Sequence, residues 1–382
     1  TLTPVTSTEF CGILRGKRTY RRTAPAQRDM KTLSYHEQNK RNLTLKQREL
    51  QAELPSFVRD FFRGRETTTS ARTRVSYAYD IRLFLNFLLQ NNPSLKGLEP
   101  KDISLEVMNS LQPVDIEEYL EYLKVYEDPE TGNQVSNDLR GIARKLSSLR
   151  SLYAYLFKHD MVTNNPTVKV EAPKLHGREI IQLDPDEVAI LLDYMEECGE
   201  ELSPHKRSYY KKTIIRDLAI ITLLLGTGIR VSECVGLELN DVDFKNDGIR
   251  IVRKGGNEMV VYFGPEVEIA LLNYIEERET IEPQPGHENA LFLSMQKRRI
   301  SDDAIENLVK KYAKGAVPQK KITPHKLRST YGTNLYRETG DIYLVADVLG
   351  HSDVNTTRKH YAKAGDTRRR MAASAVKLRE TE

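Results

Sequence analysis

The stretch LLLGTGIRVSE, residues 223–233, breaks the most apolar helix of the chain and places an arginine where the helical pattern restarts. The helix expected over residues 214–225 ends at the Gly-Thr-Gly of residues 226–228. Arg230 follows, and an arginine in this position indicates a fixed anion that requires its planar set of donors. An ordinary ion pair with Glu233 is the alternative, and the two roles are compatible.

Two later motifs also bring basic side chains to the start or the tip of an element. His325 and Arg328 lie three residues apart, after a Thr323-Pro324 pair that starts a helix. They therefore share one face near the positive end of that helix. Lys254 lies at the tip of a hairpin expected over residues 248–263, where its ammonium group can reach a ligand. Each feature also has an ordinary interpretation, because basic side chains at helix ends and hairpin tips are commonly solvated.

A third motif, LGHSDVNTT at residues 349–357, predicts a turn followed by a capped helix. Asn355 or Thr356 can cap this helix, and Tyr361 falls on its following turn, downstream of His351. The chain contains 19 tyrosines, so Tyr361 is distinguished only by its place in the sequence.

The length and composition limit the class of protein. At 382 residues the chain is long enough for two domains and a short appendage. Its longest apolar stretch is far shorter than the roughly 20 residues of a membrane span, and its first residues lack the apolar core of a secretory signal. The three cysteines lack ligand spacing, which argues against a zinc site or a disulfide framework and suits a reducing cytoplasm. No glycine-rich phosphate-binding motif indicates a nucleotide cofactor.

Charge composition, hydrophobic periodicity and the positions of the motifs divide the chain into five segments. We expect a basic N-terminal extension at 1–48, a helical domain at 49–173, a linker at 174–182, a second domain at 183–365 and a C-terminal tail at 366–382. The extension holds eleven Lys and Arg against three Asp and Glu, although the whole chain has a net charge of only +4. A flexible arm for a polyanion and a solvated tail explain this composition equally well.

The expected fold class is α+β, mainly helical, with one small antiparallel sheet in the second domain. In the first domain, the apolar stripe from Leu139 to Leu156 predicts a long helix, and a shorter one is expected from Pro113 to Tyr126. Basic residues alternate with the apolar stripes, either for contact with phosphates or as ordinary solvated helix faces. These candidates are Arg72, Arg74, Arg82, Arg140, Arg144, Lys145 and Arg150.

In order and spacing, five motifs resemble those of the tyrosine recombinase (phage-integrase) family, which includes Xer-type recombinases and mobile-element integrases: residues 226–233, 253–258, 325–328, 349–351 and 356–361. The resemblance implies a catalytic domain at residues 183–365. Residues 67–173 are similar to the family's helical core-binding domain, and the two domains would clamp DNA between them. The separation of His351 and Tyr361 is one residue longer than is commonest in the family, which the start of a helix can absorb.

The resemblance implies cleavage and rejoining of DNA through a 3′-phosphotyrosyl intermediate, without a metal ion, ATP or another cofactor. The catalytic positions it assigns are Arg230, Lys254, His325, Arg328, His351 and the nucleophile Tyr361. It also implies that Glu233 orients Arg230 without contacting the substrate.

The resemblance also implies partners. They are double-stranded DNA with recombination core sites, further copies of the chain in a homotetramer on paired sites, and an accessory DNA-bending or excision factor. No membrane is expected, and the implied location is the cytoplasm, at the nucleoid. The basic extension favours a mobile-element integrase over a Xer-type resolvase of chromosome or plasmid dimers. Further alternatives are a type IB topoisomerase, a telomere-resolving enzyme and a DNA-binding protein without catalysis.

Overall fold

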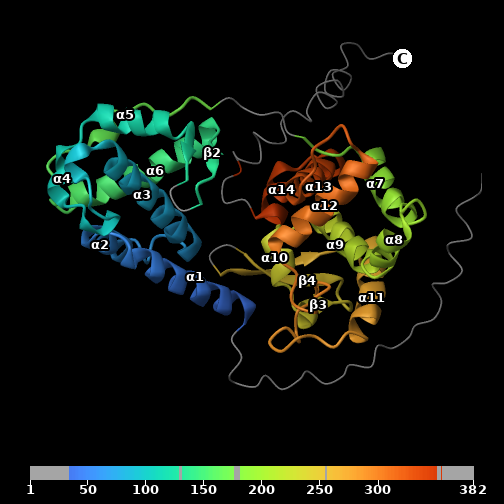
Figure 1. Ribbon diagram of the computed structural model, residues 1–382. Coiled ribbons are helices and arrows are strands. Elements are labelled where there is room, and N and C mark those ends of the chain that lie inside the picture. The colour runs from blue at the N-terminus through green and yellow to red at the C-terminus, as the bar shows by residue number, and fades with distance from the viewer. Residues whose placement is uncertain (1–33, 129–130, 176–180, 254–255, 351–353, 355–382) are drawn as a thin grey trace, which may run out of the picture. The chain divides into compact units, whose positions relative to one another are not determined.

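The computed structural model describes residues 34–128, 131–175, 181–253, 256–350 and 354 (Figure 1). Within them, helices dominate, and the two main hydrophobic clusters come from residues 50–170 and from residues 183–327. The α+β class expected from the sequence is confirmed. None of the helices in this described portion is both long and apolar enough to cross a membrane.

The first cluster is the core of a helical part. Its elements are, in chain order, α1 (Tyr35–Ala52), α2 (Ser56–Gly64), α3 (Ala71–Asn91), η1 (Pro93–Leu95), η2 (Pro100–Asp102), α4 (Leu105–Ser110), α5 (Pro113–Tyr122), β1 (Val125–Glu127), β2 (Gln134–Ser136), α6 (Leu139–Lys158) and η3 (Pro166–Val168). The boundary expected at residue 48 falls inside α1, which packs on α3 and buries Leu50 in this core.

Helices α3 and α6 pack together at the centre of this part (Figure 1). Ser70 caps α3 by accepting a hydrogen bond from the Thr73 amide at 3.1 Å. The stripe predicted from Leu139 to Leu156 forms α6, and its Leu146 and Leu149 are fully buried. The periodicity of the apolar residues therefore predicted this helix correctly.

A small hairpin occurs where the sequence predicted only helix. Helix α5 ends at Tyr122, and β1 and β2 pair antiparallel with Tyr126 opposite Val135. The Tyr126 ring stacks on that of Tyr122, with 5.2 Å between their centroids. The expected helical end at Tyr126 is thus wrong, because β-favouring residues follow the helix and bury an aromatic ring.

The second cluster is the core of the C-terminal part. Its elements are α7 (Pro185–Glu197), α8 (Pro204–Lys211), α9 (Ile214–Thr227), α10 (Val231–Gly236), η4 (Leu239–Asp241), β3 (Val242–Asp243), β4 (Gly248–Val252), β5 (Glu258–Tyr262), α11 (Pro265–Glu279), α12 (Asp302–Ala316), α13 (Pro324–Thr339) and α14 (Ile342–Leu349). The apolar helix α9 packs against α7, α11 and α13 (Figure 1).

The strands of this part form one antiparallel sheet in the order β3-β4-β5. The predicted hairpin is β4–β5, with Ile251 opposite Met259. Arg253 closes its turn, since its amide donates to the Asn257 carbonyl at 2.8 Å and its carbonyl accepts from the Gly256 amide at 3.0 Å. The backbone of Arg253 is therefore fixed to the sheet.

Candidate active site

Arg230 lies at the junction between α9 and α10, where the sequence predicted it. Helix α9 ends at Thr227 and is capped by Gly228, whose φ of 63° is left-handed and whose missing side chain leaves room for the Tyr331 ring. Arg230 then caps α10. Its amide donates to Glu233 Oε2 and its Nη1 donates to Glu233 Oε1, both at 2.7 Å.

The ion pair of Arg230 and Glu233 leaves the arginine open to a ligand. The Arg230 side chain is 36% exposed, whereas that of Glu233 is 3% exposed. The buried carboxylate thus orients the guanidinium from the protein side, and the other side of the guanidinium can receive an anion. Both roles considered for Arg230 from the sequence fit this geometry.

Arg328 reaches the same place from α13. It is only 4% exposed, and it donates from Nη1 to the Gly228 carbonyl and from Nη2 to the Leu349 carbonyl. Arg230 Nη2 donates to the next carbonyl, that of Gly350, at 3.4 Å. The two arginines, separated by almost a hundred residues in the chain, therefore meet at the C-terminal end of α14.

His325 lies on the first turn of α13, as the sequence predicted, and its side chain is exposed. Pro324 occupies the first position of the helix, and Thr323 precedes it with an extended backbone. His325 thus stands near the positive end of α13, one turn before Arg328. The remaining catalytic candidates, Lys254, His351 and Tyr361, lie outside the described residues, as do residues 366–382 of the expected tail.

Sequence reasoning missed a third guanidinium at this place. Arg253 donates from Nη2 to the Val348 carbonyl at 2.6 Å. Burial lowers the pKa of Arg253, the Glu233 carboxylate raises it, and Arg230 lowers it again, so the three groups share one electrostatic environment. The sequence contains only a weak signal for Arg253, namely its position directly before Lys254 in the expected hairpin.

Other nucleophiles and metal ligands are poorly placed in this part. Burial raises the pKa of the Cys234 thiol, on α10, which disfavours the thiolate. Burial likewise raises the pKa of Tyr331, whose ring packs against Gly228. Over the described ranges, no three His, Cys, Asp or Glu side chains come together as metal ligands. The described groups of this site suit the binding of an anion by guanidinium groups.

The seven basic candidates of the helical part fall into three groups. Arg74 and Arg150 donate to backbone carbonyls of Glu66, Thr69, Thr167 and Val170. Arg82, Arg144 and Lys145 bind the side chains of Glu53, Asp80 and Asn137. Arg72 and Arg140 are exposed.

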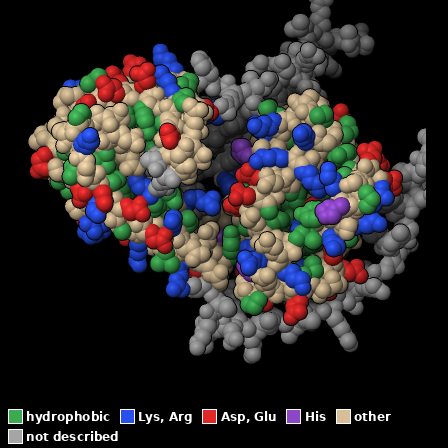
Figure 2. Space-filling view, viewed as in Figure 1, with side chains coloured by type: hydrophobic (Ala, Val, Ile, Leu, Met, Phe, Trp, Pro, Cys, Tyr) green, Lys and Arg blue, Asp and Glu red, His purple; other side chains and the backbone are tan. Residues whose placement is uncertain are grey.

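Several of these candidates are therefore occupied in holding the helical part together. Arg82, Arg144 and Lys145 also line a pocket of about 270 Å³ whose other lining residues include Asp80 and Asp128. On the face of the helical part shown in Figure 2, Lys and Arg alternate with Asp and Glu. Contact of these residues with phosphates stays a prediction, and Arg72 and Arg140 are its most exposed members.

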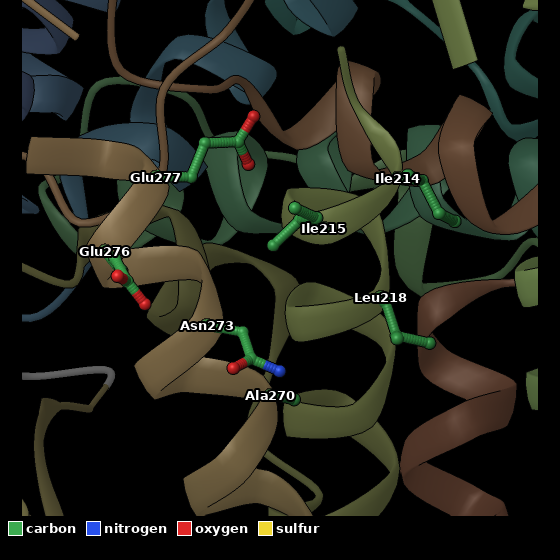
Figure 3. Close-up of a pocket in the computed structure, with 7 residues that line it drawn as sticks. All are labelled: Ile214, Ile215, Leu218, Ala270, Asn273, Glu276 and Glu277. Atoms are coloured by element: carbon green, nitrogen blue, oxygen red, sulfur yellow. The ribbon is translucent and has the colours of Figure 1, made fainter. Parts of the chain in front are cut away.

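A larger pocket of about 340 Å³ lies elsewhere in the C-terminal part. It is lined by Ile214, Ile215 and Leu218 of α9 and by Ala270, Asn273, Glu276 and Glu277 of α11 (Figure 3). Burial raises the pKa of the Glu277 carboxyl group. This pocket is separate from the arginine site, because Arg230, Arg253 and Arg328 are not among its lining residues. Its acidic and apolar side chains also do not suit a phosphate.

Comparison with known proteins gives the same family for both parts of the chain. Residues 181–368 match the model of the Phage integrase family. The chain is 33% identical over 348 residues to tyrosine recombinase XerC of Caldanaerobacter subterraneus subsp. tengcongensis, which covers 87% of this chain and 90% of that protein. It is 32% identical over 330 residues to tyrosine recombinase XerS of Streptococcus uberis, which covers 81% and 92%.

Solved structures share the fold. The Tn1549 transposon integrase in complex with transposon right end DNA has a TM-score of 0.58 at 22% identity, covering 84% of this chain and 98% of that chain. The XerH site-specific recombinase bound to palindromic difH substrate has a TM-score of 0.58 at 19% identity, covering 80% of each chain.

Proposed function

Because the chain belongs to the tyrosine recombinase family, whose members are DNA strand-transfer enzymes, we propose that Tyr361 is the nucleophile with which it cuts and rejoins DNA. The observation that carries the proposal is the meeting of Arg230 and Arg328 at the end of α14. Two guanidinium groups suit the two nonbridging oxygens of a phosphodiester. The chain continues from this point through His351 to Tyr361.

In the proposed cleavage, the phenolic oxygen of Tyr361 attacks the phosphorus of one diester. The bond from phosphorus to the 5′ oxygen breaks, its electron pair stays on that oxygen, and Lys254 donates a proton to it. His325 accepts the proton of the phenol, and His351 orients Tyr361 or supports the phosphate. A 3′-phosphotyrosyl link and a free 5′ hydroxyl result, and attack by a 5′ hydroxyl reverses the step without ATP.

Arg230 and Arg328 stabilise the charge that develops on the nonbridging oxygens in the transition state. Glu233 keeps the Arg230 guanidinium in a fixed orientation, since it accepts hydrogen bonds from both its side chain and its backbone amide. A site organised in this way before substrate binds spends little free energy on reorganisation during the reaction.

DNA is the partner of this family, and both solved structures compared above contain it. We propose that the chain acts as a homotetramer on paired duplex core sites in the cytoplasm, at the nucleoid, with an accessory DNA-bending or excision factor. Arg72 and Arg140 are proposed to contact phosphates, because their side chains are exposed.

Two biological roles have specific support. The basic composition of residues 1–48 favours a mobile-element integrase. The similarity to tyrosine recombinases XerC and XerS favours the Xer-type alternative, for which the family resemblance implies resolution of chromosome or plasmid dimers. A plasmid with two directly repeated sites and a pair of plasmids with one site each distinguish the roles. Preferential recombination within one plasmid supports resolution, and efficient joining of two plasmids supports integration.

The chemistry is tested on a duplex recovered by selecting bound sequences from a random pool, then nicked so that cleavage traps the covalent adduct. We expect the wild-type chain to form an adduct in the presence of EDTA and without ATP, and peptide mapping to find DNA on Tyr361. Tyr361→Phe should bind the duplex and form no adduct, whereas Tyr331→Phe should still form it. An adduct that persists in Tyr361→Phe would show that another residue is the nucleophile.

A further inference from the structure

The C-terminal end of α14 accepts hydrogen bonds from three arginines on three different elements. The carbonyls of Val348, Leu349 and Gly350 accept from Arg253, Arg328 and Arg230, respectively. A helix leaves its last carbonyls without partners inside the helix, and its C-terminal end carries a partial negative charge. The first of these arginines, Arg253, has no role in the proposed reaction.

We propose that Arg253 is a positioning residue, which ties the β4–β5 hairpin to the C-terminal end of α14 and so sets the place of the general acid Lys254. This inference rests on the proposed function of Lys254. Arg253 directly precedes Lys254 in the chain, and Gly350 directly precedes His351. Adjacent Cα atoms are about 3.8 Å apart, so a fixed Arg253 restricts where the neighbouring residue can lie.

Three contacts fix Arg253 itself. Its backbone closes the hairpin turn through Asn257 and Gly256. Its guanidinium donates to the Val348 carbonyl at 2.6 Å. The same guanidinium occupies the space that a side chain at Gly350 would fill, and Gly350 has a left-handed φ of 59°. Glycine at position 350 is thus required both by the backbone and by Arg253.

The side chain of Arg253 is half-buried, and part of its guanidinium group is removed from water. Its Nε and Nη1 atoms are buried, and neither has a hydrogen-bond partner among the residues that the structure describes. An arginine that only capped α14 could keep these donors in water. Arg250 on the same strand differs from Arg253, because its side chain is half-exposed and its Nε and Nη2 both donate to Asp241. Arg250 pairs with Asp241 at 2.9 Å and therefore serves as a matched control.

The first experiment uses hydrogen exchange of the full-length chain to test whether Arg253 connects the β4–β5 hairpin to α14. Arg253→Ala should increase amide exchange both in β4–β5 and in α14, because it removes the bond between them. Arg250→Ala should increase exchange only near β3 and β4. Unchanged exchange of α14 in Arg253→Ala would overturn the proposal, and this readout does not depend on catalysis.

The second experiment tests the link to Lys254 with two nicked duplexes, one with the natural 5′ oxygen and one with a bridging 5′ sulfur at the scissile phosphate. A thiol is far more acidic than an alcohol, so sulfur departs without a proton from a general acid. Arg253→Ala should cleave the oxygen duplex at least about ten-fold more slowly than wild type, and the sulfur duplex within about three-fold of it. Arg253→Lys should be intermediate on the oxygen duplex, and Arg250→Ala should match wild type on both.

An equal loss on both duplexes would overturn the positioning of Lys254, because it would mean a general structural defect. Normal cleavage of the oxygen duplex by Arg253→Ala would overturn it as well. A wild-type chain that forms no adduct on either duplex would instead contradict the proposed function. In that case hydrogen exchange would still decide whether Arg253 connects the β4–β5 hairpin to α14.

Discussion

Replacing Glu233 by Gln tests whether the buried carboxylate orients Arg230. The glutamate accepts two hydrogen bonds of 2.7 Å, one from the Arg230 amide and one from its guanidinium. A hydrogen bond to a charged group contributes about 1.5–3 kcal/mol. Because the Arg230 side chain is 36% exposed, solvent screening reduces the loss, and we expect about 1–2 kcal/mol.

This loss should appear mainly in the rate of cleavage. If the whole of it is lost from the transition state, Glu233→Gln cleaves the nicked duplex about 5–30-fold more slowly, while the affinity for the duplex changes little. The rate is measured in single-turnover adduct formation, and the affinity in a filter-binding titration at the same salt concentration.

The matched control is Glu187, which has the same local role away from the arginines. It accepts the Asp184 amide at 2.8 Å as the third residue of α7 and pairs with Lys320. Glu187→Gln should lower the free energy of unfolding by about 1 kcal/mol and leave cleavage unchanged. Cleavage by Glu233→Gln within about two-fold of wild type, or an equal slowing by Glu187→Gln, would refute the orienting role of Glu233.

Three further changes test other parts of the chain. Gly228→Ala should lower the free energy of unfolding by about 1–3 kcal/mol, measured by denaturant titration, because φ is left-handed and the Tyr331 ring fills the space; unchanged stability would contradict this packing. Deleting residues 1–34, which hold seven Lys and Arg against two Asp and Glu, should weaken duplex binding more at low than at high salt, and equal losses would show that this segment is no electrostatic arm. Arg140→Ala should reduce the slope of log affinity against log salt by about one with normal stability, whereas Arg74→Ala should lower stability; the opposite pattern would reverse their assigned roles.

The sequence predicted several helices well, because their signals are local. The spacing of apolar residues indicated α6 and α9, and the order Asp184-Pro185-Asp186-Glu187 indicated the start of α7. Arg230 stood out because two glycines interrupted an apolar helix just before it. Such patterns require no knowledge of distant segments.

The basic residues of the helical part were harder to interpret, because their partners are distant or carry no sequence signal. Arg74 binds Gln47, and Arg150 binds the backbone carbonyls of Thr167 and Val170. Every residue has a backbone carbonyl. A sequence pattern therefore cannot distinguish an arginine that binds a backbone carbonyl from an arginine that is available to bind DNA. Arg253 was missed for the same reason.

The charges around the end of α14 match one phosphodiester. Arg230, Arg253 and Arg328 contribute three positive charges, and Glu233 removes one. Arg328 also bridges the C-terminal ends of α9 and α14, and the two helix ends together contribute roughly one further negative charge. The Asp347 carboxylate, which also acts on Arg253, removes one more positive charge, and the N-terminal ends of α10 and α13 together return roughly one. These described groups thus leave about one net positive charge. A phosphodiester carries a single negative charge, whereas a terminal phosphate carries nearly two, so the balance favours an internal position in a DNA strand over a phosphorylated end.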